Sequence, residues 1–347
     1  MEQLQKGEIV LEAKGLSRAF AARNEKGLFA KKRSVHAVEG VSLTLRAGEV
    51  LAVVGESGSG KSVLARMLAR IVVPTSGELF LRGNSIDLKE RRGTSYAGEV
   101  QLILQDPFAA INPVRRVRHS LERPLLLHQT PKNELLARSH EVLASVSLTP
   151  QEDYLERYPH ELSGGQLQRI NIARGLSVNP KVLLADEPIS MLDVSVRLGV
   201  LNLLRELCDT KNLAMMYITH DIASARYIAD ETAVMYAGQV VERARGTDLI
   251  DQPVHPYTQL LISSVPNPES LEQRHTGTQG STGVAGFNVN GCRFSPRCPQ
   301  ALPICTTNEP PEVDLGGGHF ARCWLPATAE QKSAVALRPS TSSAKQQ

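Results

Sequence analysis

The sequence predicts an α/β protein whose core is a mainly parallel sheet, and three apolar runs carry this prediction. Residues 50–54, 182–185 and 215–219 are short, continuous and apolar, which is typical of strands buried on both faces. A long helix is predicted around residues 196–207, between the second and third runs. Strands and helices at this spacing pair in parallel through right-handed crossovers, so we expect one central sheet.

The composition suits a soluble protein with an aliphatic core. The 347 residues are 41% hydrophobic and only 4% aromatic, enough for one large domain plus an appendage. The net charge of +3 is too small to predict nucleic acid as the main partner, and no apolar run reaches the roughly 18 residues of a membrane span. The first residues include an acid and no apolar stretch, so we expect no secretory signal and a cytoplasmic location.

Changes of pattern along the chain predict its domains. Residues 9–13 and 41–45 alternate apolar with polar, as in half-exposed strands, and the basic stretch 21–33 between them is expected to be a solvated loop. The stretch 107–159 has helical periodicity and no buried strand. Residues 267–290 are polar and rich in Gly, Ser and Thr, like a linker. We expect an N-terminal antiparallel β subdomain with the first part of the core (1–106), an inserted helical subdomain (107–165), the second part of the core (166–266), the linker (267–290), a cysteine-bearing extension (291–325) and a disordered tail (326–347).

A phosphate-binding loop follows the first buried strand. The stretch matches G-x-x-x-x-G-K-[ST], and a helix follows in which Leu64, Met67, Leu68 and Ile71 recur at helical spacing. In this context the loop's N–H groups and the helix N-terminus converge on phosphate oxygens, which predicts a P-loop nucleotide site. The lysine would neutralise the β- and γ-phosphates, and the final serine would ligate Mg²⁺. The loop residues are Gly55, Glu56, Ser57, Gly58, Ser59, Gly60, Lys61 and Ser62.

Polar residues end three of the other apolar runs. Asp186 and Glu187 follow residues 182–185, and we predict that Asp186 holds Mg²⁺ while Glu187 acts as general base toward the attacking water. Gln105 closes the run 102–104, and its amide could reach both the metal and the water. His220 follows residues 215–219 and could donate a hydrogen bond to the γ-phosphate. Each could instead be an ordinary polar strand terminus, so these roles depend on the set as a whole.

These motifs in this order resemble the nucleotide-binding subunit of an ABC transporter, over residues 9–265. The deciding element is the signature motif Leu162-Ser163-Gly164-Gly165-Gln166, because other P-loop ATPases lack it. A serine and two glycines that open a helix form a second anion cradle. The resemblance implies that this cradle and the D-loop residue Asp193 face the ATP of an opposite subunit, so that two ATP molecules join a head-to-tail dimer. It also implies an aromatic residue that stacks on adenine, with Phe20 the candidate and Phe29 the alternative.

A narrower resemblance points to importers of dipeptides and oligopeptides. It rests on Gln105-Asp106-Pro107-Phe108, Tyr158-Pro159-His160-Glu161, His255-Pro256-Tyr257-Thr258 and the cysteine-bearing extension. The resemblance implies an energy-coupling ATPase, peripheral to the cytoplasmic face of the membrane. Its implied partners are a sister ATPase subunit, two integral membrane permease subunits and, indirectly, an extracytoplasmic solute-binding protein, with no nucleic acid. The transported solute and the choice between homodimer and heterodimer stay open. The alternative is a soluble ABC ATPase that acts on nucleic acid or ribosomes.

Four of the five cysteines lie in the short C-terminal extension, which is rich in Pro and Gly. Cys292, Cys298, Cys305 and Cys323 could hold Zn²⁺ or an iron–sulfur cluster, but their spacing lacks the C-x₂-C pairs of structural zinc sites. Extensions of this kind in the peptide-importer branch are similar and can carry a [4Fe–4S] cluster. A cluster, zinc and uncoordinated thiols are therefore alternatives here. Cys208, on an apolar helix, is expected to be a buried small hydrophobic residue.

Overall fold

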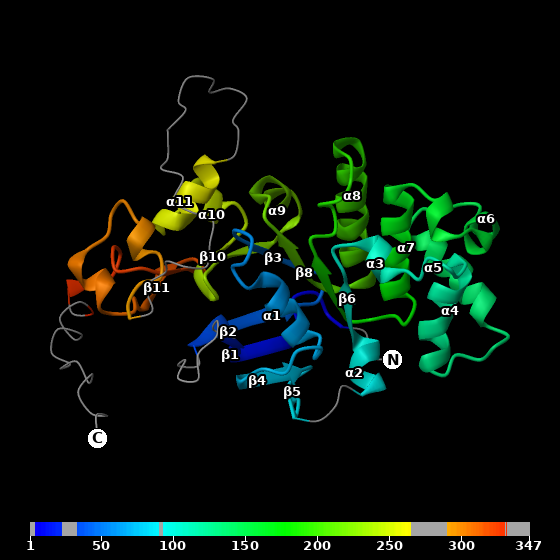
Figure 1. The fold of residues 1–347 in the computed structure, drawn as a ribbon, viewed down its shortest axis with the longest axis horizontal. Helices are drawn as coiled ribbons and strands as arrows, with labels where there is room; N and C mark the ends of the chain where they lie inside the picture. The colour runs from blue at the N-terminus through cyan, green and yellow to red at the C-terminus, as the bar shows by residue number, and fades with distance from the viewer. Residues whose placement is uncertain (1–3, 23–32, 90–92, 265–289, 330, 332–347) are drawn as a thin grey trace, which may run out of the picture.

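The computed structural model describes residues 4–22, 33–89, 93–264, 290–329 and 331 (Figure 1). Most of the basic stretch 21–33, nearly all of the predicted linker and most of the predicted tail lie outside these residues. Figure 1 shows the helices α4 (Val117–Leu127) to α6 (Gln151–Glu156) at one end of the molecule. At the other end lies the C-terminal unit, residues 290–329, around β11 (Glu312–Gly316), with the main sheet between the two ends. Within the described residues, no helix is both long enough and apolar enough to cross a bilayer.

The main sheet is parallel over most of its width, as the sequence predicts. Strand β3 (Val50–Val54) lies inside the parallel part, with every residue buried, because it is flanked by strands on both edges and covered on both faces. The three strands that come last in the chain lie side by side at one edge of the sheet, and they run antiparallel to their neighbours. In spatial order the strands described are β11 (Glu312–Gly316), β12 (His319–Arg322), β10 (Gln239–Arg245), β9 (Glu231–Tyr236), β3 (Val50–Val54), β8 (Ala214–Thr219), β7 (Val182–Asp186) and β6 (Val100–Ile103).

A second, antiparallel sheet forms the N-terminal subdomain. Its strands in spatial order are β2 (Arg33–Arg46), β1 (Ile9–Ala22), β4 (Ser76–Leu81) and β5 (Asn84–Ser85). β1 and β2 are much longer than the segments 9–13 and 41–45 predicted from alternation. Register shifts between Ala13 and Leu16, and again before Ala19, break the period-two pattern on which that prediction depended.

Helix α1 (Lys61–Leu68) begins at the phosphate loop and packs into the apolar layer that both sheets share. Leu64, Met67 and Leu68 are fully buried there, as predicted. Ile71 does not join them: it is 53% exposed, because the helix ends at Leu68 and the chain turns away before completing another turn.

Helices make up the described part of the chain between β6 and β7, apart from connecting turns. Arg116 and Arg118, near the start of α4, both form ion pairs with Glu156 on the surface of this helical region. The helices after β5 are α2 (Thr94–Glu99), α3 (Pro107–Ala110), α4 (Val117–Leu127), α5 (Leu135–Ser145), α6 (Gln151–Glu156), η1 (Pro159–Glu161), α7 (Gly164–Leu176), α8 (Val194–Lys211), α9 (Ile222–Ile228), α10 (Asp248–Asp251) and α11 (Pro256–Ser263).

The C-terminal unit is joined to the main sheet rather than separate from it. Its hairpin, β11 and β12, extends the sheet because β12 pairs with β10, and the short helices η2 (Ser295–Arg297) and η3 (Pro303–Thr306) precede the hairpin. Trp324 is 1% exposed and donates a hydrogen bond from Nε1 to the Asn308 carbonyl, 3.1 Å away. The sequence does not reveal this pairing, since the two strands are short and separated from β10 by residues 246–311.

A buried carboxylate ties the C-terminal unit to helix α11. Glu242 on β10 accepts hydrogen bonds from the backbone N–H groups of Val254 and His255, at 2.7 and 3.0 Å, and its Oε1 lies 2.8 Å from His319 Nε2. His255 then begins α11, because its Nδ1 accepts a hydrogen bond from the Tyr257 N–H at 3.1 Å. That bond requires the neutral imidazole, and burial lowers the pKa of His255 to about 4.

The neutral state of His255 predicts how stability depends on pH. Its pKa is depressed in the folded chain, so the unfolded chain binds more protons between about pH 6.5 and about pH 4, and stability is lost as pH falls through that window. Denaturant unfolding at a series of pH values should show a loss of up to about 1.4 kcal/mol per pH unit from this group. In His255→Asn, which keeps a side-chain acceptor but cannot titrate, the loss should be shallower. Parallel curves for the two proteins would contradict this account.

Candidate nucleotide-binding site

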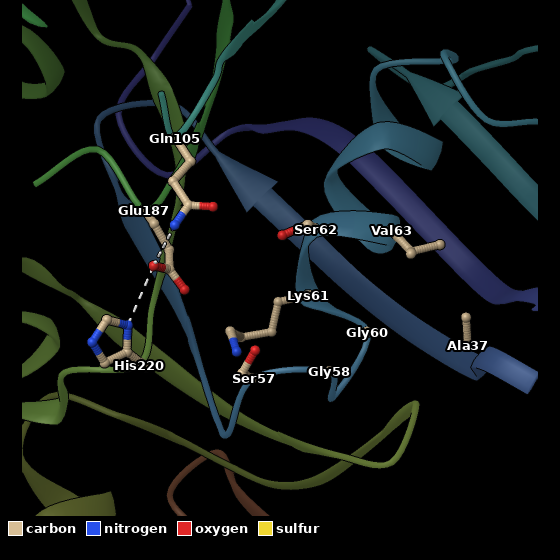
Figure 2. Close-up of a pocket in the computed structure, with 10 residues that line it drawn as sticks. All are labelled: Ala37, Ser57, Gly58, Gly60, Lys61, Ser62, Val63, Gln105, Glu187 and His220. Atoms are coloured by element: carbon tan, nitrogen blue, oxygen red, sulfur yellow. Dashed lines mark hydrogen bonds and ion pairs between the residues drawn. The ribbon is translucent and has the colours of Figure 1, made fainter. Parts of the chain in front are cut away.

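A cavity of about 510 Å³ opens at the carboxyl edge of the parallel strands. This volume is within the range typical of small-ligand sites. Figure 2 shows Gln105, Glu187 and His220 on one side of it and the phosphate loop on the other. The cavity brings together residues from β2, the loop before α1, α1 itself and the ends of β6, β7 and β8. Its lining residues are Ala37, Ser57, Gly58, Gly60, Lys61, Ser62, Val63, Gln105, Glu187 and His220.

Two glycines allow the phosphate loop to pass between neighbouring strands. A Cβ on Gly55 would lie 2.2 Å from the Met235 carbonyl oxygen, and one on Gly60 would lie 2.1 Å from the Ala37 carbonyl oxygen. Both positions also have positive φ angles, 153° at Gly55 and 104° at Gly60. Only a residue without a side chain satisfies both conditions, so the loop and its contact with β2 depend on these glycines.

Lys61 bonds to the loop's own backbone in this structure. Its Nζ donates to the Gly55 carbonyl at 2.7 Å and to the Glu56 carbonyl at 2.9 Å, and it lies 3.4 Å from Ser59 Oγ. Burial lowers the pKa of Lys61, and the carboxylates of Glu187, Asp186 and Glu56 act in the opposite direction. A phosphate group would meet a buried ammonium whose present partners are neutral oxygens, which is a favourable arrangement for exchange to an anion.

Ser62 and Asp186 form the oxygen-rich part of the site. The Ser62 hydroxyl donates to Asp186 Oδ1 at 2.9 Å. Asp186 is 2% exposed, and burial raises its pKa, opposed by this hydrogen bond and by the positive charge of Arg66. A hydroxyl and a carboxylate side by side are hard oxygen donors of the kind that Mg²⁺ prefers, so the predicted pair fits this ion.

Glu187 lies between Gln105 and His220, and Figure 2 shows the three side chains together. Glu187 Oε2 accepts a hydrogen bond from Gln105 Nε2 at 3.2 Å and lies 3.3 Å from His220 Nδ1. The backbone at Glu187 has a φ of 46°, unusual for a residue with a side chain, and its N–H and carbonyl bond to Ile218 and Ser190. The turn is thus held so that Glu187 lines the cavity, while the preceding residue, Asp186, bonds to the lining residue Ser62.

Other predicted site residues do not line the cavity. Phe20, proposed to stack on adenine, is 38% exposed on β1 beneath the guanidinium of Arg18, 4.8 Å from the ring centroid. The alternative, Phe29, lies outside the described residues. Ser59 and Glu56 belong to the loop but do not line the cavity: the Ser59 carbonyl accepts from Gly238 and the Glu56 carboxylate accepts from Arg297. Ala37 and Val63 line the cavity and were not predicted, because an alanine in a strand and a valine after the serine carry no polar signal.

The signature residues lie elsewhere, at the start of α7. Ser163 Oγ accepts from the Gln166 N–H at 3.3 Å, and Gln166 Oε1 accepts from the Ser163 N–H at 3.0 Å, a reciprocal cap that holds the helix N-terminus. A Cβ on Gly165 would lie 2.7 Å from Val196 Cγ1, so the motif packs closely against α8, whose N-cap is Asp193. Neither these residues nor Asp193 line the chain's own nucleotide cavity.

The four C-terminal cysteines do not form a metal centre in this structure. All four are among the described residues, and within those residues no group of three or more His, Cys, Asp or Glu side chains is arranged to hold a metal ion. Burial raises the pKa of the thiols of Cys292 and Cys298, and that of Cys323 to about 11. Cys305 packs with Trp324 and Val313 in a small apolar cluster. The predicted cluster or zinc ion is therefore not supported; Cys305 and Cys323 are buried, and Cys292 and Cys298 are partly buried. Cys208 is fully buried, as predicted.

Comparison with known proteins places the site in a family. The family model described as ABC transporter matches residues 38–190, and that described as oligopeptide/dipeptide transporter, C-terminal region, matches residues 241–305. The oligopeptide transport ATP-binding protein AppF of Bacillus subtilis (strain 168) is 40% identical over 325 residues, which is 92% of this chain and 98% of AppF. The dipeptide transport ATP-binding protein DppF of Escherichia coli (strain K12) is 39% identical, over 89% of this chain and 92% of DppF.

Solved structures agree with this assignment. The dimeric bacterial ABC transporter cassette MJ0796 matches with a TM-score of 0.57 and 25% identity, over 68% of this chain and 98% of that one; a second MJ0796 dimer is in a post-hydrolysis state with ADP and Pi bound. CbiO1 of Clostridium perfringens, part of the cbiONQ ABC transporter complex, matches with a TM-score of 0.60 and 26% identity, over 71% of this chain and 92% of its own. The site is thus that of an ATP-hydrolysing cassette. More narrowly, the chain belongs to the oligopeptide and dipeptide transport ATP-binding proteins of the ABC transporter family.

The close approach at Gly60 predicts a sharp loss of nucleotide binding on a small change. In Gly60→Ala the new methyl group would collide with the Ala37 carbonyl, so the loop must move, and we expect ATP affinity to fall by about tenfold or more. Titration with ATP would measure this. Gly83→Ala is the matched control, since Gly83 has a φ of 75° but no atom within 4 Å of its added Cβ. Equal effects of the two substitutions would show that steric contact with β2 is unimportant.

Proposed function

We propose that this chain is the ATP-hydrolysing, energy-coupling subunit of an importer for peptides or similar small solutes. The observation that carries the proposal is the separation of two half-sites. Lys61, Ser62 and Glu187 line one cavity, whereas the Ser163 cradle opens elsewhere on the same chain. A second subunit placed head to tail would bring its cradle over the first subunit's γ-phosphate.

The residues of the cavity support specific roles in hydrolysis. The loop N–H groups and Lys61 would bind the phosphates, after Lys61 exchanges its bonds to loop carbonyls for phosphate oxygens. Mg²⁺, held by Ser62, Asp186 and Gln105, would supply neutralisation of phosphate charge when bound. Glu187 would take a proton from water as the water oxygen bonds to the γ-phosphorus and the bond from that phosphorus to ADP breaks.

Two neighbouring side chains would support this base. Gln105 donates to Glu187 in the structure and would help to orient the water, and His220, 60% exposed at the cavity rim, would donate to the γ-phosphate. Ser163, Gly164, Gly165 and Gln166, with Asp193, would complete the partner's site rather than their own. Phe20 would stack on adenine, on a strand adjacent to the one that carries Ala37.

The relatives support the transport assignment. Those named above are oligopeptide and dipeptide transport ATP-binding proteins, and we infer the same cargo class and a peripheral position on the cytoplasmic face of a membrane. The partners would be a sister ATPase subunit and two integral membrane permease subunits, served by an extracytoplasmic solute-binding protein. Exposed Phe108, just after Gln105 and 56% accessible, lies at the boundary of the helical region where a permease would contact it. We infer no nucleic-acid partner.

Replacing the base should separate ATP binding from ATP hydrolysis. In Glu187→Gln we expect turnover to fall by about 100-fold or more, since a general base contributes at least that factor, while ATP binding persists. An ATP-dependent dimer, homomeric or with a sister subunit, should accumulate and be visible by size-exclusion chromatography with light scattering. Glu206→Gln, at an exposed position on α8, is the control. Unchanged hydrolysis in the first variant would assign the base elsewhere.

Isolation from membranes should distinguish the importer from the soluble alternative. We expect the affinity-tagged chain, extracted in mild detergent from its own cell type, to retain two integral membrane proteins and a second ATPase. Mass spectrometry of the purified complex would identify them by their hydrophobic spans. If the chain were instead recovered without detergent, in a complex with RNA, DNA or ribosomal proteins, the result would favour the nucleic-acid alternative and contradict the transport proposal.

A further inference from the structure

The C-terminal unit reaches the phosphate loop directly. The guanidinium of Arg297 donates two parallel hydrogen bonds to the carboxylate of Glu56, Nη1 to Oε2 and Nη2 to Oε1, both at 2.9 Å. Glu56 is the second residue of the loop, so a side chain 241 positions further along the chain holds it in a bidentate pair. The guanidinium also lies 5.8 Å from the ring centroids of Tyr236 and Phe294, which fix its approach.

The backbone of Glu56 is held from the same side. Its N–H donates to the Tyr257 hydroxyl at 2.9 Å, and Tyr257 is fully buried. The rings of Tyr236, Tyr257 and Phe294 pack on one another, with centroids 4.6 to 5.4 Å apart. Phe294 belongs to the C-terminal unit and is 1% exposed, so this unit supplies part of the core beneath the loop.

A second connection reaches the middle of the loop. Arg293 pairs with Glu39 on β2 and donates to the Ala237 carbonyl in the turn between β9 and β10. The next residue in that turn, Gly238, donates its N–H to the Ser59 carbonyl at 2.9 Å. The C-terminal unit is therefore anchored on β2 and on the turn between β9 and β10, and Arg297 is presented to Glu56 from a fixed base.

The charge of Glu56 explains why such a partner is needed. A carboxylate in a loop that receives a triphosphate repels the ligand, and Glu56 is near enough to Lys61 for its charge to act on that ammonium. Arg297 supplies the opposite charge at hydrogen-bonding distance. Glu56 and Arg297 are about 45% and 37% exposed, so the repulsion and its compensation are both moderated by water.

We propose that Arg297 is a positioning residue for ATP binding: it neutralises Glu56 and holds this carboxylate away from the phosphates, so that the C-terminal unit forms part of the nucleotide site. The proposal rests on the ATP-binding function and extends it to a region outside the cassette motifs. Loss of Arg297 would leave an uncompensated negative charge in the phosphate loop.

The test is a double-substitution cycle read by equilibrium binding of ATP. In Arg297→Gln we expect the Kd for ATP to rise by about three- to fivefold, as for loss of a partly exposed charge pair, with kcat at saturating ATP within about twofold of the parent. Glu56→Gln alone should bind ATP at least as well as the parent. The double variant should return to within about twofold of the parent, because removing the carboxylate removes the repulsion.

Two further measurements separate this electrostatic role from a purely structural one. The defect of Arg297→Gln should shrink as salt is raised, since screening weakens repulsion between partly exposed charges. Arg322→Gln removes a guanidinium of the same C-terminal unit, paired with Glu312 at 3.6 Å, and should leave ATP affinity unchanged. Thermal unfolding confirms that each variant is folded.

Three results would overturn the proposal: no rise in the Kd of Arg297→Gln, an equal rise in Arg322→Gln, or a double variant as weak as the single one. These three results are all comparisons of Kd for ATP, and none of them uses hydrolysis or transport. If the assignment of the general base or of the transported solute were wrong, the ATP-binding measurements would therefore still test the role of Arg297.

Discussion

The site depends on parallel strands that end together at one edge of the sheet. In the register observed, Val54 on β3 pairs with Thr219 on β8, and Asp186 on β7 pairs with Ile218. The residues just beyond these pairs are therefore neighbours in space: Gly55, His220 and Glu187. Carboxylate, imidazole and phosphate loop, distant along the chain, meet because each immediately follows a strand of common direction.

The backbone at this edge is unusually constrained. The phosphate loop passes close to the carbonyls of Met235 and Ala37, and Glu187 has a left-handed conformation stabilised by bonds to Ile218 and Ser190. Such strain persists only where the surroundings over-determine it. Here the surroundings are strands of the main sheet whose side chains are buried in two apolar clusters. These strands hold the backbone that carries the charged residues of the site.

The same rigidity joins the C-terminal unit to the chemistry. Its hairpin extends the main sheet through β10, its Phe294 fills the aromatic cluster under the loop, and its arginines contact Glu39, Ala237 and Glu56. Glu242 adds a buried link, since it accepts hydrogen bonds from the start of α11 and lies within bonding distance of His319. A segment that contains no nucleotide motif is thus continuous with the nucleotide site.

Much of the fold and most of the candidate site could be predicted from local sequence. The buried strands are continuous apolar runs, and a loop that must turn tightly around phosphate requires glycines at fixed spacing, so both leave a direct mark. Predictions that depend on a regular period were less accurate. Register shifts break the alternation in β1 and β2, so their full length was not predicted. Helix α1 ends early, so Ile71 is exposed. Ala37 could not be predicted as a site residue, because its backbone carbonyl and its place on β2 bring it to the cavity and its side chain carries no polar group.

Four cysteines in a short segment suggested a metal, yet the described residues form no metal-binding group and two of the four cysteines are buried. Composition cannot distinguish a ligand from a small apolar residue, since that difference lies in geometry. By itself, the sequence determined that the chain binds and hydrolyses ATP, because that chemistry needs particular residue types at fixed short spacings. Only the tertiary structure decided which distant residues support the loop, because the pairing of Glu56 with Arg297 and of β10 with β12 is set by the sheet and not by any local pattern.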